Sequence, residues 1–129
     1  MNSQLLVVDK VNFSNEHKKH IIGHILEDIT VPALPFVCTF HMFIALKELP
    51  DRATFELQLK MKDRNGKDVG ISSPITMYHE RKDDQSSEME TSLKMSMVLS
   101  LEGTYTAELY YDGEVVTTHT VHVQMEQVS

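Results

Sequence analysis

Seven histidines are present among the 129 residues, and three of them are close together. His17, His20 and His24 follow the spacing H-x2-H-x3-H, which on a helix places all three imidazoles on one face. Imidazoles that converge in this way can hold zinc. In a loop, or with His24 in a strand beside Gly23, the three side chains would not converge. We therefore predict a solvated loop and no metal site, and we keep these three histidines as the candidate ligands.

The sequence predicts structural roles for two other histidines and for the single cysteine. His119 and His122 are three residues apart in a predicted strand, so their side chains point to opposite faces and cannot share a ligand. His119 lies two residues before the apolar Val121, so both side chains point to the inward face of the predicted strand. This position favours a hydrogen-bonded histidine in the core or at its rim. Cys38 lies in the most apolar segment, where burial would raise the pKa of its thiol and make it unreactive.

Catalytic signatures are absent from the sequence. It contains no G-x-S-x-G element of a serine hydrolase and no glycine-rich phosphate loop. A calcium loop needs several carboxylates around one cation, and the two candidates are Asp63 with Asp68 and the pair Asp83-Asp84. The first pair flanks a turn, and two basic residues precede the second. We predict no catalytic residues, no cofactor and no enzymatic activity.

The charge of the chain excludes two classes of partner. Nineteen acidic and twelve basic residues give a net charge of -7, which repels nucleic acids and anionic lipid surfaces. The N-terminus has a short apolar run, Leu5–Val8, without the basic residues of a secretory signal. The apolar segment Phe36–Leu46 is too short to span a bilayer. Because a single cysteine cannot form an internal disulfide, we expect a cytoplasmic protein.

The positions of apolar residues predict an all-β chain. Polar and apolar residues alternate along most of residues 1–129, with turn residues between the runs, as in a single antiparallel β-sandwich domain of the immunoglobulin-like or C2-like kind. Asn65-Gly66 and Asp112-Gly113 supply the positive φ angles of tight hairpin turns. Eight strands are predicted, at Gln4–Asp9, Ile21–Ile29, Phe36–Leu46, Thr54–Lys62, Asp68–His79, Glu88–Leu99, Thr104–Tyr111 and Glu114–Met125.

The first half of the chain is less regular. Pro32 and Pro35 exclude a helix interior and a central strand, so they predict a kinked crossover. The next strand, Phe36–Leu46, is apolar on both parities, which predicts a central strand with both faces partly covered, or one side of a dimer. Lys10–His20 is predicted to be a polar connection, and a helix would fit only around Asn15–His24. Four methionines of one parity are predicted to pack in the core: Met77, Met89, Met95 and Met97.

The order of these features resembles a family of small bacterial and phage proteins of unknown function. The resemblance implies a C2-like or immunoglobulin-like sandwich and carries over no catalytic residues. It rests on the segments Leu5–Asp9, Ile22–Ile25, Asp28–Thr30, Val31–Pro35, Gly103–Tyr105 and Tyr111–Glu114.

Three classes of function are compatible with this sequence. The favoured hypothesis is a non-enzymatic interaction module, encoded by a phage or mobile element, that binds a host or other partner protein through a sheet face or an exposed edge strand, as a monomer or a homo-oligomer. The alternative is a sandwich that sequesters a small ligand or a metal, which the histidines favour. The third is an enzyme of unrecognised type, for which His119 and Cys38 would be the residues to substitute.

Overall fold

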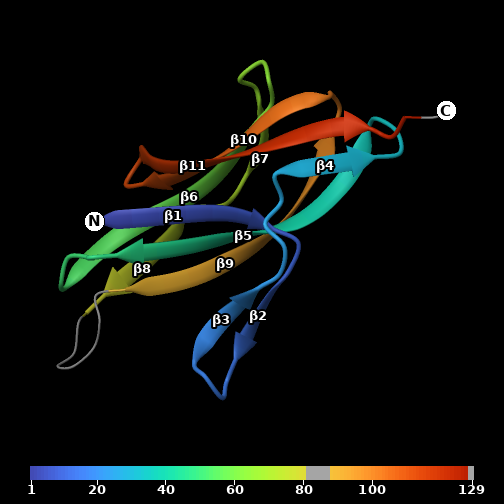
Figure 1. Ribbon diagram of the computed structural model, residues 1–129. Helices are drawn as coiled ribbons and strands as arrows, with labels where there is room; N and C mark the ends of the chain where they lie inside the picture. Colours follow the sequence, from blue (N-terminus) through green and yellow to red (C-terminus); the bar gives the residue numbers. More distant parts are fainter. Residues whose placement is uncertain (81–87, 128–129) are drawn as a thin grey trace.

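The chain is all β in the computed structural model, which describes residues 1–80 and 88–127 (Figure 1). None of these residues lies in a helix long and apolar enough to cross a membrane. The described residues form eleven strands: β1 (Asn2–Val8), β2 (Val11–Ser14), β3 (Lys19–Ile22), β4 (Asp28–Val31), β5 (Phe36–Lys47), β6 (Ala53–Lys62), β7 (Asp68–Ile71), β8 (Ile75–His79), β9 (Met89–Leu99), β10 (Gly103–Tyr111) and β11 (Glu114–Met125).

Most of the strands lie in two sheets that face each other in a sandwich-like arrangement (Figure 1). The three-stranded sheet is antiparallel and has the order β1-β5-β9. The six-stranded sheet has the order β4-β11-β10-β6, and β7 and β8 pair one after the other with the remaining edge of β6. Within it, β4 runs parallel to β11. β2 and β3 form a separate antiparallel hairpin.

One apolar core fills the space between the two sheets. Alternate side chains of each strand point into it, because successive residues of a strand face opposite sides of a sheet. Met95 and Met97 are buried there, and Met77 and Met89 pack against it, so the predicted role of these methionines is confirmed. The largest fully buried side chains are those of Tyr105, Phe40, Phe55, Met42, Ile44, Leu46, Leu57, Leu59 and Leu109.

The predicted all-β class is confirmed, but the predicted number of strands, eight, is wrong. β5, β6, β9, β10 and β11 occupy the segments predicted for them. The segment Asp68–His79, predicted as one strand, is split into β7 and β8. Pro74 lacks a backbone N–H, and Ser72 ends β7 by bonding Leu59 twice, through its N–H to the carbonyl oxygen at 2.8 Å and through Oγ to the amide at 2.9 Å.

The largest error concerns the segment after β1. Lys10–His20 was expected to be a polar connection and Asn15–His24 the place for a helix, but β2 and β3 pair here as a hairpin. Ser14 Oγ accepts a hydrogen bond from the His17 amide in the turn, and Lys18 adopts a φ of 52°. Local turn bonding and pairing therefore replace the expected helix.

The predicted strand Ile21–Ile29 is also wrong over most of its length. β3 ends at Ile22, and β4 begins only at Asp28. Between them, Ile25 makes an isolated bridge to Val8, which ties the connection to the three-stranded sheet. The chain thus passes from the hairpin to the six-stranded sheet across the end of β1.

Turns and crossovers follow the local sequence closely. Asp112 and Gly113 have φ angles of 49° and 85°, as a two-residue turn with two positive φ angles requires, and they join β10 to β11. Asn65-Gly66 joins β6 to β7, although of these two residues only Gly66 has a positive φ, 79°. The proline-containing segment 32–35 carries the chain from β4 in one sheet to β5 in the other, so the predicted crossover is confirmed.

A buried tyrosine fixes the entry to β10. Tyr105 is 2% exposed, and its hydroxyl donates a hydrogen bond to the Leu101 carbonyl oxygen at 2.8 Å and accepts one from the Leu101 amide at 3.3 Å. These bonds hold the connection between β9 and β10 against the end of the core.

We expect Tyr105→Phe to lower the free energy of unfolding by about 1 kcal/mol, because both backbone groups of Leu101 lose a partner. This should lower Tm by roughly 4 °C. Urea and thermal unfolding followed by circular dichroism would measure both. The matched control is Tyr78→Phe, since Tyr78 is 60% exposed and should tolerate the change; equal stability of the two variants would contradict the role of the Tyr105 hydroxyl.

Candidate functional site

The β2–β3 hairpin packs on the outward face of the three-stranded sheet. Val11 and Ile22, at the base of the hairpin, pack against the buried residues Val8, Phe43 and Ala45. Phe43 and Ala45 belong to the parity of β5 that points away from the main core. The hairpin therefore explains why β5 is apolar on both faces, as the sequence predicted for a central strand with both faces partly covered.

Asp9 holds the two arms of the hairpin together at its base. Its carboxylate accepts a hydrogen bond from the His24 amide at 2.7 Å, and its second oxygen lies 3.3 Å from His24 Nδ1. The Asp9 amide donates to the His24 carbonyl oxygen at 3.1 Å. Gly23 passes so close that an added Cβ would lie 2.1 Å from Asp9 Oδ1, so a side chain at this position would displace the carboxylate.

Opposing effects set the pKa of Asp9. Loss of hydration raises the pKa. The hydrogen bonds from the His24 backbone and ring, together with the charge of that ring, lower the pKa by a larger amount. The net effect is a pKa below the ordinary value of 3.8. The ionised form of Asp9 is therefore the form that the closed hairpin base favours.

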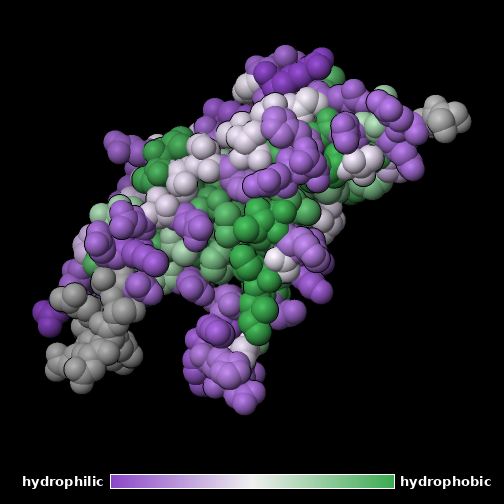
Figure 2. Space-filling view, viewed as in Figure 1, coloured by the Kyte–Doolittle hydropathy of each residue, from purple (hydrophilic) through white to green (hydrophobic). Residues whose placement is uncertain are grey.

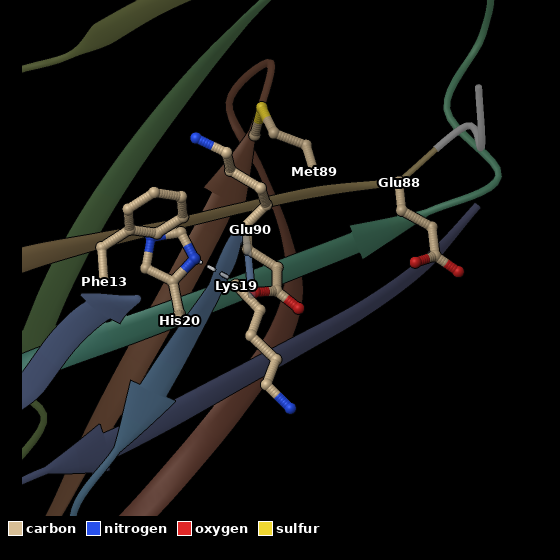
Figure 3. Close-up of a pocket in the computed structure, with 7 residues that line it drawn as sticks. Phe13, Lys19, His20, Glu88, Met89 and Glu90 are labelled. Carbon is tan, nitrogen blue, oxygen red and sulfur yellow. Dashed lines mark hydrogen bonds and ion pairs between the residues drawn. The ribbon is translucent and has the colours of Figure 1, made fainter. Parts of the chain in front are cut away.

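His20 connects the hairpin to β9. Its Nδ1 lies 3.0 Å from Glu90 Oε2, and its ring makes edge contacts with the rings of Phe13 and Phe43, at centroid distances of 5.2 and 5.8 Å. Figure 3 shows the imidazole directed toward Glu90 with the Phe13 ring beside it. Aromatic and polar contacts thus fix the hairpin where it crosses β9.

Beyond this crossing, the hairpin projects past the edge of the sheet (Figure 1). Phe13 pairs with His20 and lies on the same face of the hairpin as Val11 and Ile22, the face that covers the sheet. Phe13 is nevertheless 52% exposed. Figure 2 shows an apolar surface that runs from the sandwich into the base of this projection, whose tip is hydrophilic. The covering face of the hairpin therefore extends beyond the sheet that it covers.

The hairpin tip and the start of β9 border an open hollow of about 290 Å³. Phe13, Lys18, Lys19 and His20 of the hairpin line it, together with Glu88, Met89 and Glu90 at the start of β9 (Figure 3).

β9 is an edge strand of the three-stranded sheet. All eleven of its residues are in register with β5, and no other strand of the described residues pairs with its free edge. A second hollow of about 310 Å³ follows the same edge, between Leu93 and Met95 of β9 and Ile71 and Ile75 of the opposite sheet. We call the stretch from Glu88 to Ser96, with these two hollows, the β9 edge. An edge strand presents unpaired backbone groups and can accept another strand.

The three candidate metal ligands are not brought together. His17 lies in the hairpin turn, 4.0 Å from Glu16, while His20 contacts Glu90 and His24 contacts Asp9. Among the described residues, no group of three or more His, Cys, Asp or Glu side chains could hold a metal ion. His20 and His24 instead hold the hairpin.

Other predicted positions have structural roles. His119 points inward, and its Nε2 lies 2.8 Å from the Leu26 carbonyl oxygen, which confirms a hydrogen-bonded histidine at the rim of the core. Burial raises the pKa of the Cys38 thiol, as expected. The Asp63 carboxylate accepts hydrogen bonds from the Asn65 and Lys67 amides and so stabilises its turn. The pair Asp83-Asp84 lies outside the described residues.

The hairpin and the β9 edge were missed in the sequence. Only a weak signal for the hairpin was present, because Val11 and Phe13 alternate with polar residues before the turn, whereas Lys19–Ile22 after the turn do not alternate. The edge carries no local signal, since the order of strands in a sheet depends on distant segments.

Comparisons with known proteins support the fold but assign no activity. The family model described as a family of unknown function (DUF6941) matches residues 3–124. No curated protein is similar enough in sequence to count as a match. A β-glucosidase from Listeria innocua superposes with a TM-score of 0.56 at 10% identity, over 99% of this chain and 16% of that chain. Its complex with isofagomine gives a TM-score of 0.56 at 10% identity, over 98% and 17%. The chain thus spans about a sixth of that enzyme, and the likeness shows the fold alone.

We expect His20→Ala to weaken the docking of the hairpin by about 1–2 kcal/mol, because the ring loses contacts with two aromatic neighbours. Amide exchange in β2 and β3 should then become roughly 5–30-fold faster, as measured by NMR. His17→Ala is the control, because the His17 side chain is 60% exposed. Equal exchange in the two variants would contradict the anchoring role of His20.

The hairpin base should loosen in acid. The pKa of Asp9 is lower in the folded chain than in the unfolded one, so its stabilising effect is present above about pH 4 and is lost as the pH falls through the lowered pKa. An NMR titration of the Asp9 carboxyl and the His24 amide should give one shared midpoint below 3.8. In Asp9→Asn the transition of the His24 amide should vanish; a transition that persists would assign it to another group.

Proposed function

The chain belongs to DUF6941, a family of unknown function, and from this premise we propose that it is a non-enzymatic interaction module that binds an extended segment of a partner protein along the β9 edge. Strand addition of this kind uses backbone hydrogen bonds for affinity and side-chain pockets for specificity. The β9 edge offers both, because no described strand pairs with the free side of β9 and two hollows adjoin it.

The observation that carries this proposal is the position of Phe13. The ring lies on the covering face of the hairpin, beside the His20 ring and over the start of β9 (Figure 3), and it is 52% exposed. A strand added to β9 would extend the three-stranded sheet into this space and would be covered by Phe13 as β5 is covered by Val11 and Ile22. Phe13 would thereby become buried, and buried aromatic side chains often contribute most of the binding energy of an interface.

The two faces of the β9 edge define the segment that would fit. Side chains of the added strand that point inward would meet Leu93 and Met95 of β9 and Ile71 of the opposite sheet, so they should be apolar. Side chains that point outward would lie beside Glu90 and Lys94, so they should be polar or charged. The partner segment is therefore extended, with alternating apolar and polar residues.

We also propose that the sandwich is of the immunoglobulin-like class. The bond from the Tyr105 hydroxyl to the backbone four residues upstream resembles the tyrosine corner of immunoglobulin-like sandwiches, which favours that class over the C2-like one. The single cysteine favours the cytoplasm as the place where the module acts. That its gene belongs to a phage or mobile element remains a prediction.

Site-specific photo-crosslinking in the source cells tests the proposed function. A photoreactive residue in place of Ser96 should give a discrete protein adduct, because Ser96 lines the hollow along the β9 edge. The matched control replaces Thr118, an exposed residue on the outward face of β11, and should give none.

Phe13→Ala, introduced together with the Ser96 probe, should reduce the adduct about tenfold or more, which corresponds to about 1.4 kcal/mol of binding energy. Phe13 is only half-exposed and contacts the His20 ring, so this variant should also weaken the docking of the hairpin by about 0.5–1.5 kcal/mol. Amide exchange in β2 and β3 would measure that loss separately from the loss of the adduct. No adduct at Ser96, or equal adducts at Ser96 and Thr118, would overturn the proposed function.

A further inference from the structure

We propose that the segment that β9 accepts is β9 of a second copy of this chain, paired antiparallel about a twofold axis at Ser92. This inference rests on the proposed function of the β9 edge and names its partner. The dimer would join two three-stranded sheets into one continuous sheet of six strands. Each copy would then satisfy the free edge of the other, as expected for a closed twofold interface.

β9 itself has the pattern that its edge requires. Met89, Leu93, Met95 and Met97 point toward the core and are apolar, and Thr91 is the polar residue of that face, while Ser92 and Lys94 point outward. Paired about Ser92, the inward residues of one copy would lie over the hollow between Leu93 and Ile71 of the other. The strand can therefore fill the site that it helps to form.

The charges along β9 select this register. In antiparallel pairing centred on Ser92, Glu90 of each copy lies opposite Lys94 of the other, so two ion pairs form about the axis. Pairing centred on Lys94 would instead place the two lysines opposite each other, which is unfavourable. Among the described residues Lys94 has no acidic partner within ion-pair distance. Glu90 has His20 as its ion-pair partner, and Lys18 and Lys19 line the same hollow.

The projecting hairpin fits over the added strand. Since His20 contacts Glu90, the hairpin crosses β9 at Glu90, and Lys94 of the second copy would lie directly beneath Phe13 and beside Glu90. An ammonium group below an aromatic ring is a favourable contact. The points at which the two hairpins cross the paired strands would be four residues apart, about 14 Å at roughly 3.4 Å per residue. The strands of a hairpin are about 4.8 Å apart, so the two hairpins can lie side by side.

Cysteine crosslinking tests the register. In a Cys38→Ser background, Ser92→Cys places two thiols directly opposite each other on the axis, at a Cα separation that a disulfide can span. Mild oxidation of the full chain should link more than half of it into a dimer. Thr118→Cys in the same background is the matched control and should remain monomeric.

Charge reversal tests the ion pairs in the chain without engineered cysteines. The unsubstituted chain should sediment at twice the mass of one chain at micromolar concentration. Lys94→Glu places like charges opposite each other at both sites and should raise the dimer dissociation constant about tenfold or more. The double variant Glu90→Lys with Lys94→Glu should recover at least half of that loss on a logarithmic scale, whereas no recovery would overturn the register.

Failure of the dimer can be told apart from failure of the proposed function. A chain that stays monomeric at concentrations up to about a millimolar, with no disulfide in Ser92→Cys, overturns the second copy as the partner. If the Ser96 photo-adduct then contains a different protein, the β9 edge still binds a partner and only its identity changes. If no adduct forms either, both proposals are overturned.

Discussion

The apolar character of both faces of β5 is the constraint on which the rest of the structure depends. One face belongs to the core between the sheets, and the other carries Phe43 and Ala45 away from it. A strand of this kind must be covered twice, because exposed apolar surface of this size is unfavourable in water. The β2–β3 hairpin supplies the second cover, and Asp9 and His20 determine where it lies. Beyond this cover, the hairpin projects past the sheet (Figure 1).

Segments with strong local periodicity could be predicted from the sequence, and those held by distant contacts could not. β6, β9, β10 and β11 alternate over nine residues or more, and the turn at Asp112-Gly113 needs only its own positive φ angles. β2, β3 and β4 have four residues each, too few for alternation to be distinguished from a polar loop. Their pairing depends on contacts such as Asp9 with His24 and Phe43 with His20, which bring together residues far apart in sequence.

The candidate site was hidden from the sequence for the same reason. The histidine spacing predicted a shared face only for a helix, but His17 lies in the hairpin turn, His20 in β3 and His24 beyond the end of β3. Their actual partners, Asp9 and Glu90, are 15 and 70 positions away. Cys38 and His119 were predicted well because burial and strand parity decide their environments, and both can be read locally. A single outward lysine such as Lys94 does not identify an edge strand, since the exposure of the edge depends on the order of strands in the sheet.

Edge strands in natural proteins usually carry features that discourage pairing, such as a central lysine, a proline or a bulge. β9 has the lysine, but Lys94 lies on the outward face, four residues from a glutamate of opposite charge on the same face. That glutamate reduces the ability of Lys94 to prevent pairing, because in an antiparallel copy of the strand the glutamate can lie opposite the lysine. A one-residue slip would turn Lys94 toward the apolar gap between the sheets, so pairing is restricted to registers that keep the charges outside. In the dimer that we propose, these same two residues would favour the register in which Glu90 of each copy lies opposite Lys94 of the other.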